Sequence, residues 1–208
     1  MGQEKSALNN NSIEFLALGD SYTICQGVKE YERWPLVLAE QLKQNGFNVN
    51  RVDIVAKTGW TTKNLSNAIN KSDLKDYNLV SLLIGVNNQF QNIPFHVFKL
   101  EFDALLQKAI DIAKNKQRMF VVSIPDYGVT PFGKRNSDII SKEINNYNNY
   151  IKDACKQQGI LFINITDISR KLGDSPKALA SDNLHPGAYQ YKKWVDKILP
   201  EALLLLNK

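Results

Sequence analysis

One serine, one histidine and one aspartate in this 208-residue sequence are placed where nucleophilic chemistry could use them. Ser21 lies in the segment Gly-Asp-Ser-Tyr-Thr that begins at residue 19, and His185 lies near the C-terminus with Asp182 three residues before it. A serine hydroxyl becomes a nucleophile only when a base within hydrogen-bonding distance accepts its proton. A tight loop could bring the Asp182 carboxylate to one imidazole nitrogen and leave the other nitrogen free for Ser21. These three residues therefore predict a catalytic triad for acyl transfer.

Acyl transfer also needs hydrogen-bond donors for the negative charge that develops on the carbonyl oxygen of the substrate. Three groups in the sequence are candidates: the backbone N–H of Ser21, the backbone N–H of Gly59 and the side-chain amide of Asn87. Gly59 suits this role because a residue without a side chain lets a substrate approach its backbone closely. We expect the three donors to form an oxyanion hole.

Alternating strands and helices must position these residues, and this alternation is typical of an α/β fold with a parallel sheet. The predicted strands are 14–18, 49–56, 79–84, 119–124 and 160–165. The predicted helices are 34–45, 62–71, 95–116, 137–157 and 186–205. The last helix is expected to begin at Pro186, because proline suits the first helical position. We expect a three-layer α/β/α sandwich with about five parallel strands. Residues 1–208 should form one domain, with residues 1–12 as a frayed N-terminus.

The oxyanion-hole candidates all follow a predicted strand. The carboxyl ends of parallel strands lie along one edge of a sheet, which is where ligands bind in such folds. Taken singly, each segment is more typical of a turn, and His185 with Asp182 is more typical of a helix start. Their convergence at one sheet edge favours an active site. The second histidine, His96, has no acidic partner at a suggestive spacing, and we assign it no role.

Four segments of the sequence resemble the sequence blocks of the SGNH (GDSL-type) hydrolases. The matching segments are residues 19–23 for block I, Gly59 for block II, residues 85–88 (Gly-Val-Asn-Asn) for block III and residues 182–186 (Asp-Asn-Leu-His-Pro) for block V. The resemblance spans residues 13–205. Two positions depart from the family pattern: Tyr22 replaces the leucine of the family name, and Asn88 stands where an aspartate is common.

The resemblance implies a flavodoxin-like SGNH hydrolase fold and a serine esterase that works through an acyl-enzyme, with no cofactor. It implies that Ser21 is the nucleophile and first oxyanion donor. It also implies that Asn87 is the side-chain donor and that Asp182 and His185 complete the triad.

The substrate is less defined than the chemistry. Aromatic residues in or beside the loops at the strand ends could bind it, namely Tyr22, Trp60, Phe90, Tyr127 and Phe132. These loops lack a long apolar lid, which argues against a lipase for long-chain triglycerides. We expect small acyl esters as substrates, with O-acetylated carbohydrates first and lysophospholipids or thioesters second.

Two alternatives from other classes remain. The chain could be a non-catalytic relative that keeps a ligand cleft, although its catalytic set is complete. It could also be a flavodoxin-like nucleotide binder, but residues 19–26 contain a single glycine and do not form a phosphate-binding loop.

Composition and charge argue against several other partners. The net charge is +5, but the lysines are scattered and the longest basic cluster is Lys192-Lys193, so we expect no nucleic-acid partner. No apolar run approaches the roughly 18 residues of a membrane span, so we expect no stable membrane insertion. Two histidines and two distant cysteines, Cys25 and Cys155, give no metal-ligand or redox spacing. We therefore expect no metal. For the two cysteines, free thiols are the simpler expectation, and a disulfide between them is the alternative.

The sequence opens without a recognisable signal peptide. We therefore expect a cytoplasmic protein, or an exported one if a signal has been removed from this sequence. Nothing in the sequence indicates the oligomeric state.

Overall fold

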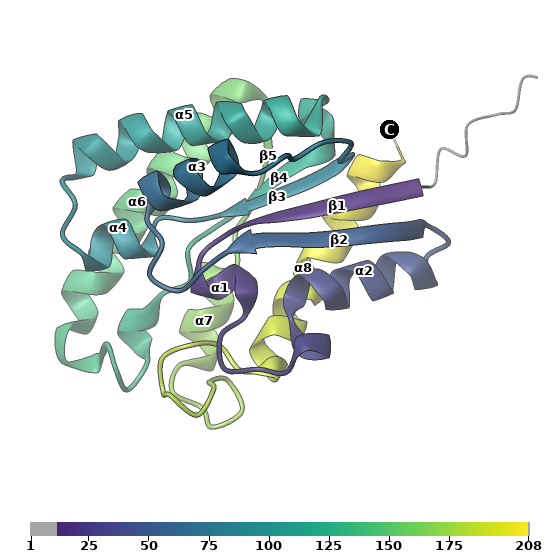
Figure 1. Ribbon diagram of the computed structural model, residues 1–208. Coiled ribbons are helices and arrows are strands. Elements are labelled where there is room, and N and C mark those ends of the chain that lie inside the picture. Colours follow the sequence, from purple (N-terminus) through teal and green to yellow (C-terminus); the bar gives the residue numbers. More distant parts are fainter. Residues whose placement is uncertain (1–11, 208) are drawn as a thin grey trace, which may run out of the picture.

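A computed structural model describes residues 12–207, in which helices cover both faces of a parallel β-sheet (Figure 1). The sheet has five strands in the order β2-β1-β3-β4-β5, and every neighbouring pair is parallel. The strands are β1 (Ser12–Gly19), β2 (Asn48–Ala56), β3 (Leu79–Leu83), β4 (Met119–Val122) and β5 (Leu161–Ile163). The predicted α/β sandwich with five parallel strands is confirmed.

Two layers of helices bury the sheet. One face carries α2 (Trp34–Gln44) and α8 (Ala188–Leu206), and the other carries α3 (Thr62–Lys71), α5 (Phe95–Ala113) and α6 (Ser137–Gln158) (Figure 1). The central strand β3 is buried along its whole length, as its nearly uninterrupted apolar sequence predicts. Between residues 12 and 207, no helix is both long enough and apolar enough to cross a membrane.

Three short helices follow strands directly and were not predicted. They are α1 (Ser21–Ile24) after β1, α4 (Val86–Phe90) after β3 and α7 (Thr166–Leu172) after β5. Segments of four to seven residues are too short to display a helical repeat of apolar residues. All three begin at the carboxyl edge of the sheet, where the candidate site residues lie.

Most predicted boundaries agree with the structure within two residues, and α3 agrees at both ends. Helix α5 ends three residues early because Lys114 adopts a left-handed φ of 57° and Asn115 then caps a separate 3-10 turn. Ser12 already belongs to β1, so the predicted fraying is wrong at that residue. The other residues of that prediction, 1–11, lie outside the described residues.

Strands β4 and β5 are shorter than predicted because side chains replace the strand partners at their ends. Asn148 donates to the carbonyl of Ile124 at 2.9 Å and accepts from the Ile124 N–H at 2.8 Å. Ser123 Oγ accepts from the Ile165 N–H at 2.8 Å. These contacts satisfy the backbone and release the chain from the sheet.

The predicted start of the last helix at Pro186 is wrong, because α8 begins at Ala188. Pro186 pairs instead with Leu179 in an isolated antiparallel bridge. The His185 carbonyl accepts from the Ala180 N–H at 2.8 Å, and the Gly187 N–H donates to the Ala178 carbonyl at 2.7 Å. The bridge holds the chain extended through Pro186 and fixes the segment that carries His185.

Candidate active site

Ser21 is the first residue of α1, immediately after β1. Gly19 makes this tight connection possible, because a Cβ there would overlap the Thr23 side chain and the Leu83 carbonyl. Asp20 caps α1, and its Oδ1 accepts from the Tyr22 N–H at 3.0 Å. The N–H groups of a first helical turn have no acceptor within their helix, so the Ser21 N–H is available to a ligand.

His185 reaches Ser21 from the other end of the chain. Its Nε2 lies 3.0 Å from Ser21 Oγ, and its Nδ1 lies 2.6 Å from Asp182 Oδ2. The ring of Tyr22 meets the imidazole edge-on, with ring centroids 5.8 Å apart. The structure therefore brings the predicted serine, histidine and aspartate into one hydrogen-bonded chain.

Asp182 is fixed by its own backbone. Its Oδ1 accepts from the N–H groups of Leu184 at 3.0 Å and His185 at 2.9 Å, which leaves Oδ2 for the imidazole. Burial opposes ionisation of this carboxyl, but the hydrogen bonds from the side chain and backbone of His185 and from Leu184 outweigh it. The pKa of Asp182 is therefore lowered, and the group is a carboxylate at neutral pH.

The pKa of Asp20, one residue before Ser21, is shifted in the opposite direction. Burial raises the pKa of this carboxyl from its ordinary 3.8 to about 7, against the hydrogen bond from the Tyr22 N–H. Its Oδ2 is buried and has no hydrogen-bond partner among the described residues. Asp20 therefore keeps its proton up to about pH 7, whereas Asp182 has already lost its proton at lower pH.

The other oxyanion-hole candidates are Gly59, in the loop after β2, and Asn87, in the adjoining helix α4. Gly59 has a φ of 79°, which favours glycine, and its N–H donates to no described residue. Asn87 Nδ2 donates to the Trp60 carbonyl at 3.0 Å, and because an amide carries two hydrogens, one remains for a ligand. Gln91, the C-cap of α4, also donates from Nε2 to the Gly59 carbonyl at 3.0 Å, so α4 and the loop after β2 are tied together twice.

Asn88, which departs from the family pattern, holds this arrangement from behind. It is fully buried, its Oδ1 accepts from the Thr62 N–H at 3.0 Å, and its Nδ2 donates to Thr62 Oγ1 at 2.7 Å. A carboxylate could only accept. The amide at this position therefore makes a donor–acceptor pair with the start of α3.

These groups surround a cleft of about 220 Å³. Its walls come from the segments that follow β1, β2, β3 and β4 and from the segment that carries His185. The lining residues are Ser21, Tyr22, Thr58, Gly59, Val86, Asn87, Phe90, Tyr127, Phe132, Leu184 and His185. Asp182 lies behind the imidazole. Sequence reasoning missed Thr58, Val86 and Leu184, although each is a chain neighbour of a predicted site residue.

Trp60 is the one predicted aromatic that does not line the cleft. It is half-buried against the core, and only its carbonyl serves the site, through Asn87. Tyr22 is almost fully buried and borders the cleft beside His185, whereas Phe90 and Phe132 are exposed at the rim. The predicted aromatic set thus divides into a buried wall and an exposed rim.

The sequence profile of the GDSL-like Lipase/Acylhydrolase family matches residues 17–193. The chain belongs to this family. It is therefore a hydrolase of carboxylic esters, and its substrates are small molecules. Among curated proteins, none matches the chain in sequence.

Solved structures of other GDSL-like hydrolases and esterases share the fold. A family 3 carbohydrate esterase from Clostridium thermocellum is 21% identical, with 94% of this chain and 98% of that one covered and a TM-score of 0.72. TesA is 16% identical, with 92% and 99% covered and a TM-score of 0.70. An acetyl xylan esterase from Geobacillus stearothermophilus is 17% identical, with 91% and 94% covered and a TM-score of 0.68. At these identities the likeness is one of fold.

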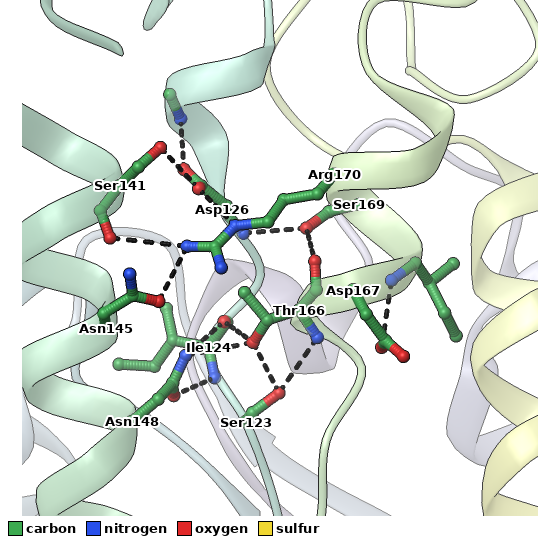
Figure 2. A network of polar contacts seen from close by, with 12 residues as sticks. Ser123, Ile124, Asp126, Ser141, Asn145, Asn148, Thr166, Asp167, Ser169 and Arg170 are labelled. Carbon is green, nitrogen blue, oxygen red and sulfur yellow. Dashed lines mark hydrogen bonds and ion pairs between the residues drawn. The ribbon is translucent and has the colours of Figure 1, made fainter. Parts of the chain in front are cut away.

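In this GDSL-like hydrolase a second polar network lies at the ends of β4 and β5 (Figure 2). Asp126 is its centre, and its Oδ2 accepts from Arg170 Nε at 2.8 Å and from Ser141 Oγ at 2.6 Å. Arg170 also donates to Asn145 Oδ1 at 2.9 Å. The network ties α7 to α6 and fixes the start of the loop that carries Tyr127 and Phe132 to the cleft.

Proposed function

We propose that this protein is a serine esterase that hydrolyses small acyl esters, with O-acetylated carbohydrates as the first substrate class. The observation that carries the proposal is the hydrogen-bonded chain from Ser21 through His185 to Asp182, which opens into the cleft at Ser21. Spacing of this kind lets an imidazole take the serine proton while a carboxylate holds its tautomer.

In the first half-reaction Ser21 Oγ attacks the ester carbonyl, and its proton passes to His185 Nε2. The negative charge on the carbonyl oxygen is stabilised by the N–H groups of Ser21 and Gly59 and by the amide of Asn87. When the tetrahedral intermediate collapses, the C–O bond to the alcohol breaks and the alcohol takes the proton from the imidazolium. An acyl-serine remains.

In the second half-reaction water attacks the acyl-serine and gives a proton to His185 Nε2. Collapse of the new intermediate releases the acid, and Ser21 Oγ recovers its proton from the imidazolium. Asp182 stays ionised throughout and stabilises the imidazolium twice per turnover. Its lowered pKa supports this role.

The size of the cleft supports a short acyl group. Tyr22 and Leu184 line the cleft together with Ser21, and the cleft of about 220 Å³ is smaller than the pockets of roughly 300–1,000 Å³ that hold drug-sized ligands. Two proteins of similar fold are named as a carbohydrate esterase and an acetyl xylan esterase, which agrees with an acetyl ester. Lysophospholipids or thioesters are the second candidate, because the apolar side chains of Val86 and Phe132 could receive a longer chain.

The proposal is tested by hydrolysis of p-nitrophenyl esters from acetate to palmitate, with wild type and Ser21→Ala side by side. We expect turnover by the wild type, its loss in the variant, and a preference for acetate. Full turnover by Ser21→Ala would show that Ser21 is not the nucleophile. No turnover by the wild type on any ester would favour a non-catalytic ligand-binding relative. The cytoplasmic location stays a prediction, and the unpaired thiols of Cys25 and Cys155 agree with a reducing compartment.

A further inference from the structure

Three hollows lie in a row from Ser21 along α4 and α6, and the first is the catalytic cleft. The second, of about 340 Å³, shares three aromatic residues with that cleft, namely Phe90, Tyr127 and Phe132. The third, of about 290 Å³, shares three polar residues with the second, namely Gln89, Asn92 and Glu143. We call the second and third hollows together the distal groove. It continues the catalytic cleft away from Ser21.

The junction between the cleft and the distal groove is aromatic and open to solvent. Phe90 and Phe132 are 52% and 53% exposed, and their ring centroids lie 6.1 Å apart. Tyr127 lies against both, at 6.2 Å and 6.5 Å. Large apolar side chains that gather in solvent beside a cleft mark a binding surface. Their flat faces suit the apolar face of a sugar ring.

Beyond the aromatic junction the distal groove mixes polar and apolar groups. Its amides and its single carboxylate lie among the side chains of Ile93, Phe95, Ile139, Ile140 and Tyr147. Asn92, Asn136 and Asn146 are exposed there, beside Gln89 and Glu143. Planar amide and carboxylate groups match pairs of neighbouring hydroxyls, because an amide offers both a donor and an acceptor.

The floor of the distal groove is already organised. Tyr127 Oη donates to Gln89 Oε1 at 2.8 Å, and Gln89 Nε2 donates to Glu143 Oε2 at 2.7 Å. This chain of hydrogen bonds fixes Gln89 and one oxygen of Glu143, and leaves the other oxygen to a ligand. A site that is ordered beforehand loses less conformational entropy on binding.

The lining favours a neutral, hydroxyl-rich ligand over anionic and purely apolar ligands. The residues that line the distal groove include no lysine, arginine or histidine, so a phosphate or another anionic group would meet only the charge of Glu143. A long acyl chain could pack on the apolar residues of the lining, but it would cover the amides and Glu143 without satisfying their hydrogen bonds, which is costly. A neutral ligand rich in hydroxyls avoids both penalties.

We propose that the distal groove binds the sugar chain of an O-acetylated oligosaccharide while one acetyl ester lies against Ser21. The inference rests on the proposed esterase function and adds that the enzyme recognises several sugar units rather than the acyl group alone. The aromatic junction stacks on the sugar that carries the ester or on its neighbour, and the amides bind the units beyond.

The experiment compares kcat/KM for three sets of substrates: O-acetylated xylose and xylohexaose, O-acetylated mannose and mannohexaose, and p-nitrophenyl acetate. We expect at least one hexamer to exceed its monomer by about tenfold or more, the effect of two or three additional hydrogen bonds. The test variant is Asn146→Trp, which places a large side chain in the far hollow. The matched control is Asn149→Trp, at an exposed position of α6 that does not line the distal groove.

The preference for the hexamer is measured as kcat/KM for the hexamer divided by kcat/KM for p-nitrophenyl acetate. Asn146→Trp should remove most of this ratio, and Asn149→Trp should keep it. Glu143→Ala should lower the ratio by several-fold. Equal rates for monomer and hexamer on both backbones, or the same ratio in both tryptophan variants, would overturn the proposal. Failure of the proposed function looks different, because the wild type would then cleave neither p-nitrophenyl acetate nor any sugar ester.

Discussion

Asp126 and Asp182 lie in the same kind of turn, but their second oxygens meet different partners. In each, Oδ1 accepts from the backbone N–H two residues on, at 2.9 Å from Gly128 and 3.0 Å from Leu184. Asp126 is fully buried and its Oδ2 binds Arg170, whose charge is permanent. The side chain of Asp182 is 36% exposed, and its Oδ2 binds the imidazole of His185, which carries no permanent charge.

The comparison shows that the turn only fixes the position of the carboxylate. The group that binds Oδ2 determines whether the carboxylate has a structural or a chemical role. A permanent cation makes Asp126 a link between α6 and α7. An imidazole that borders the cleft makes Asp182 part of the proposed chemistry. Asp20 is the third case, since its Oδ1 also accepts from the N–H two residues on, while its Oδ2 is buried with no partner among the described residues.

The largest expected effect separates the two aspartates by activity. Asp182→Asn should lower kcat for p-nitrophenyl acetate by about 10³- to 10⁴-fold, because an amide cannot stabilise the imidazolium or hold its tautomer. Its free energy of unfolding should change by less than about 1 kcal/mol, since the pair is partly exposed. Steady-state hydrolysis assays measure kcat, and urea unfolding of the same protein preparation measures the free energy of unfolding. A loss of kcat below tenfold would make the Asp182–His185 pair structural.

Asp20→Asn should have the next largest effect, and it concerns pH. The carboxyl titrates at about 7 in the folded protein and at 3.8 ordinarily, so the unfolded chain loses this proton first. The stability contributed by protonated Asp20 is complete below about pH 4 and is lost as the pH rises through 7. An amide keeps the Oδ1 acceptor but does not titrate. The wild type should therefore lose up to roughly 4 kcal/mol relative to Asp20→Asn between pH 4 and pH 8.

Urea unfolding across that pH range checks the slope rather than the absolute stability. The slope is the informative quantity because the substitution also has a cost that does not depend on pH. The amide Nδ2 replaces an oxygen that already lacks a hydrogen-bond partner, and burying it lowers the stability equally at every pH. Parallel stability curves for the two proteins would show that Asp20 ionises normally in the fold.

The sequence predicted the Asp182 arrangement and not the Asp126 arrangement, for a physical reason. His185 is three residues from Asp182, so a local loop suffices to join them. Arg170 is 44 residues from Asp126 and meets it only because β4 and β5 are adjacent in the sheet. In the sequence, Asp126 looks like any turn residue that follows a strand.

The same dependence on distant contacts explains the other differences between the predicted and the observed structure. Strands and long helices were predictable because their apolar residues repeat over many positions. The direction of the Trp60 side chain depends on packing against the core, and the late start of α8 depends on the bridge from Leu179 to Pro186. Neither follows from local preference, and Pro186 in isolation favours a helix start.

Asp126→Asn should reverse the pattern of Asp182→Asn. It weakens a buried pair and leaves Arg170 with a neutral partner, so the free energy of unfolding should fall by about 2 kcal/mol. The value is below that of a fully buried pair because the Arg170 side chain is 37% exposed. The kcat for p-nitrophenyl acetate should stay within a few-fold of the wild type. A collapse of kcat with unchanged stability would place Asp126 in the chemistry instead.

Arg170→Lys should have the smallest effect and tests whether the link needs the shape of the cation or only its charge. Arg170 uses two nitrogens at once, Nε on Asp126 and an Nη on Asn145 and the Ser141 carbonyl. A lysine ammonium is a single point of charge and cannot span those acceptors. The free energy of unfolding should fall by about 1 kcal/mol, roughly half the loss expected for Asp126→Asn. If the lysine variant is as stable as the wild type, charge alone joins α6 to α7, and the hydrogen bond to Asn145 adds nothing.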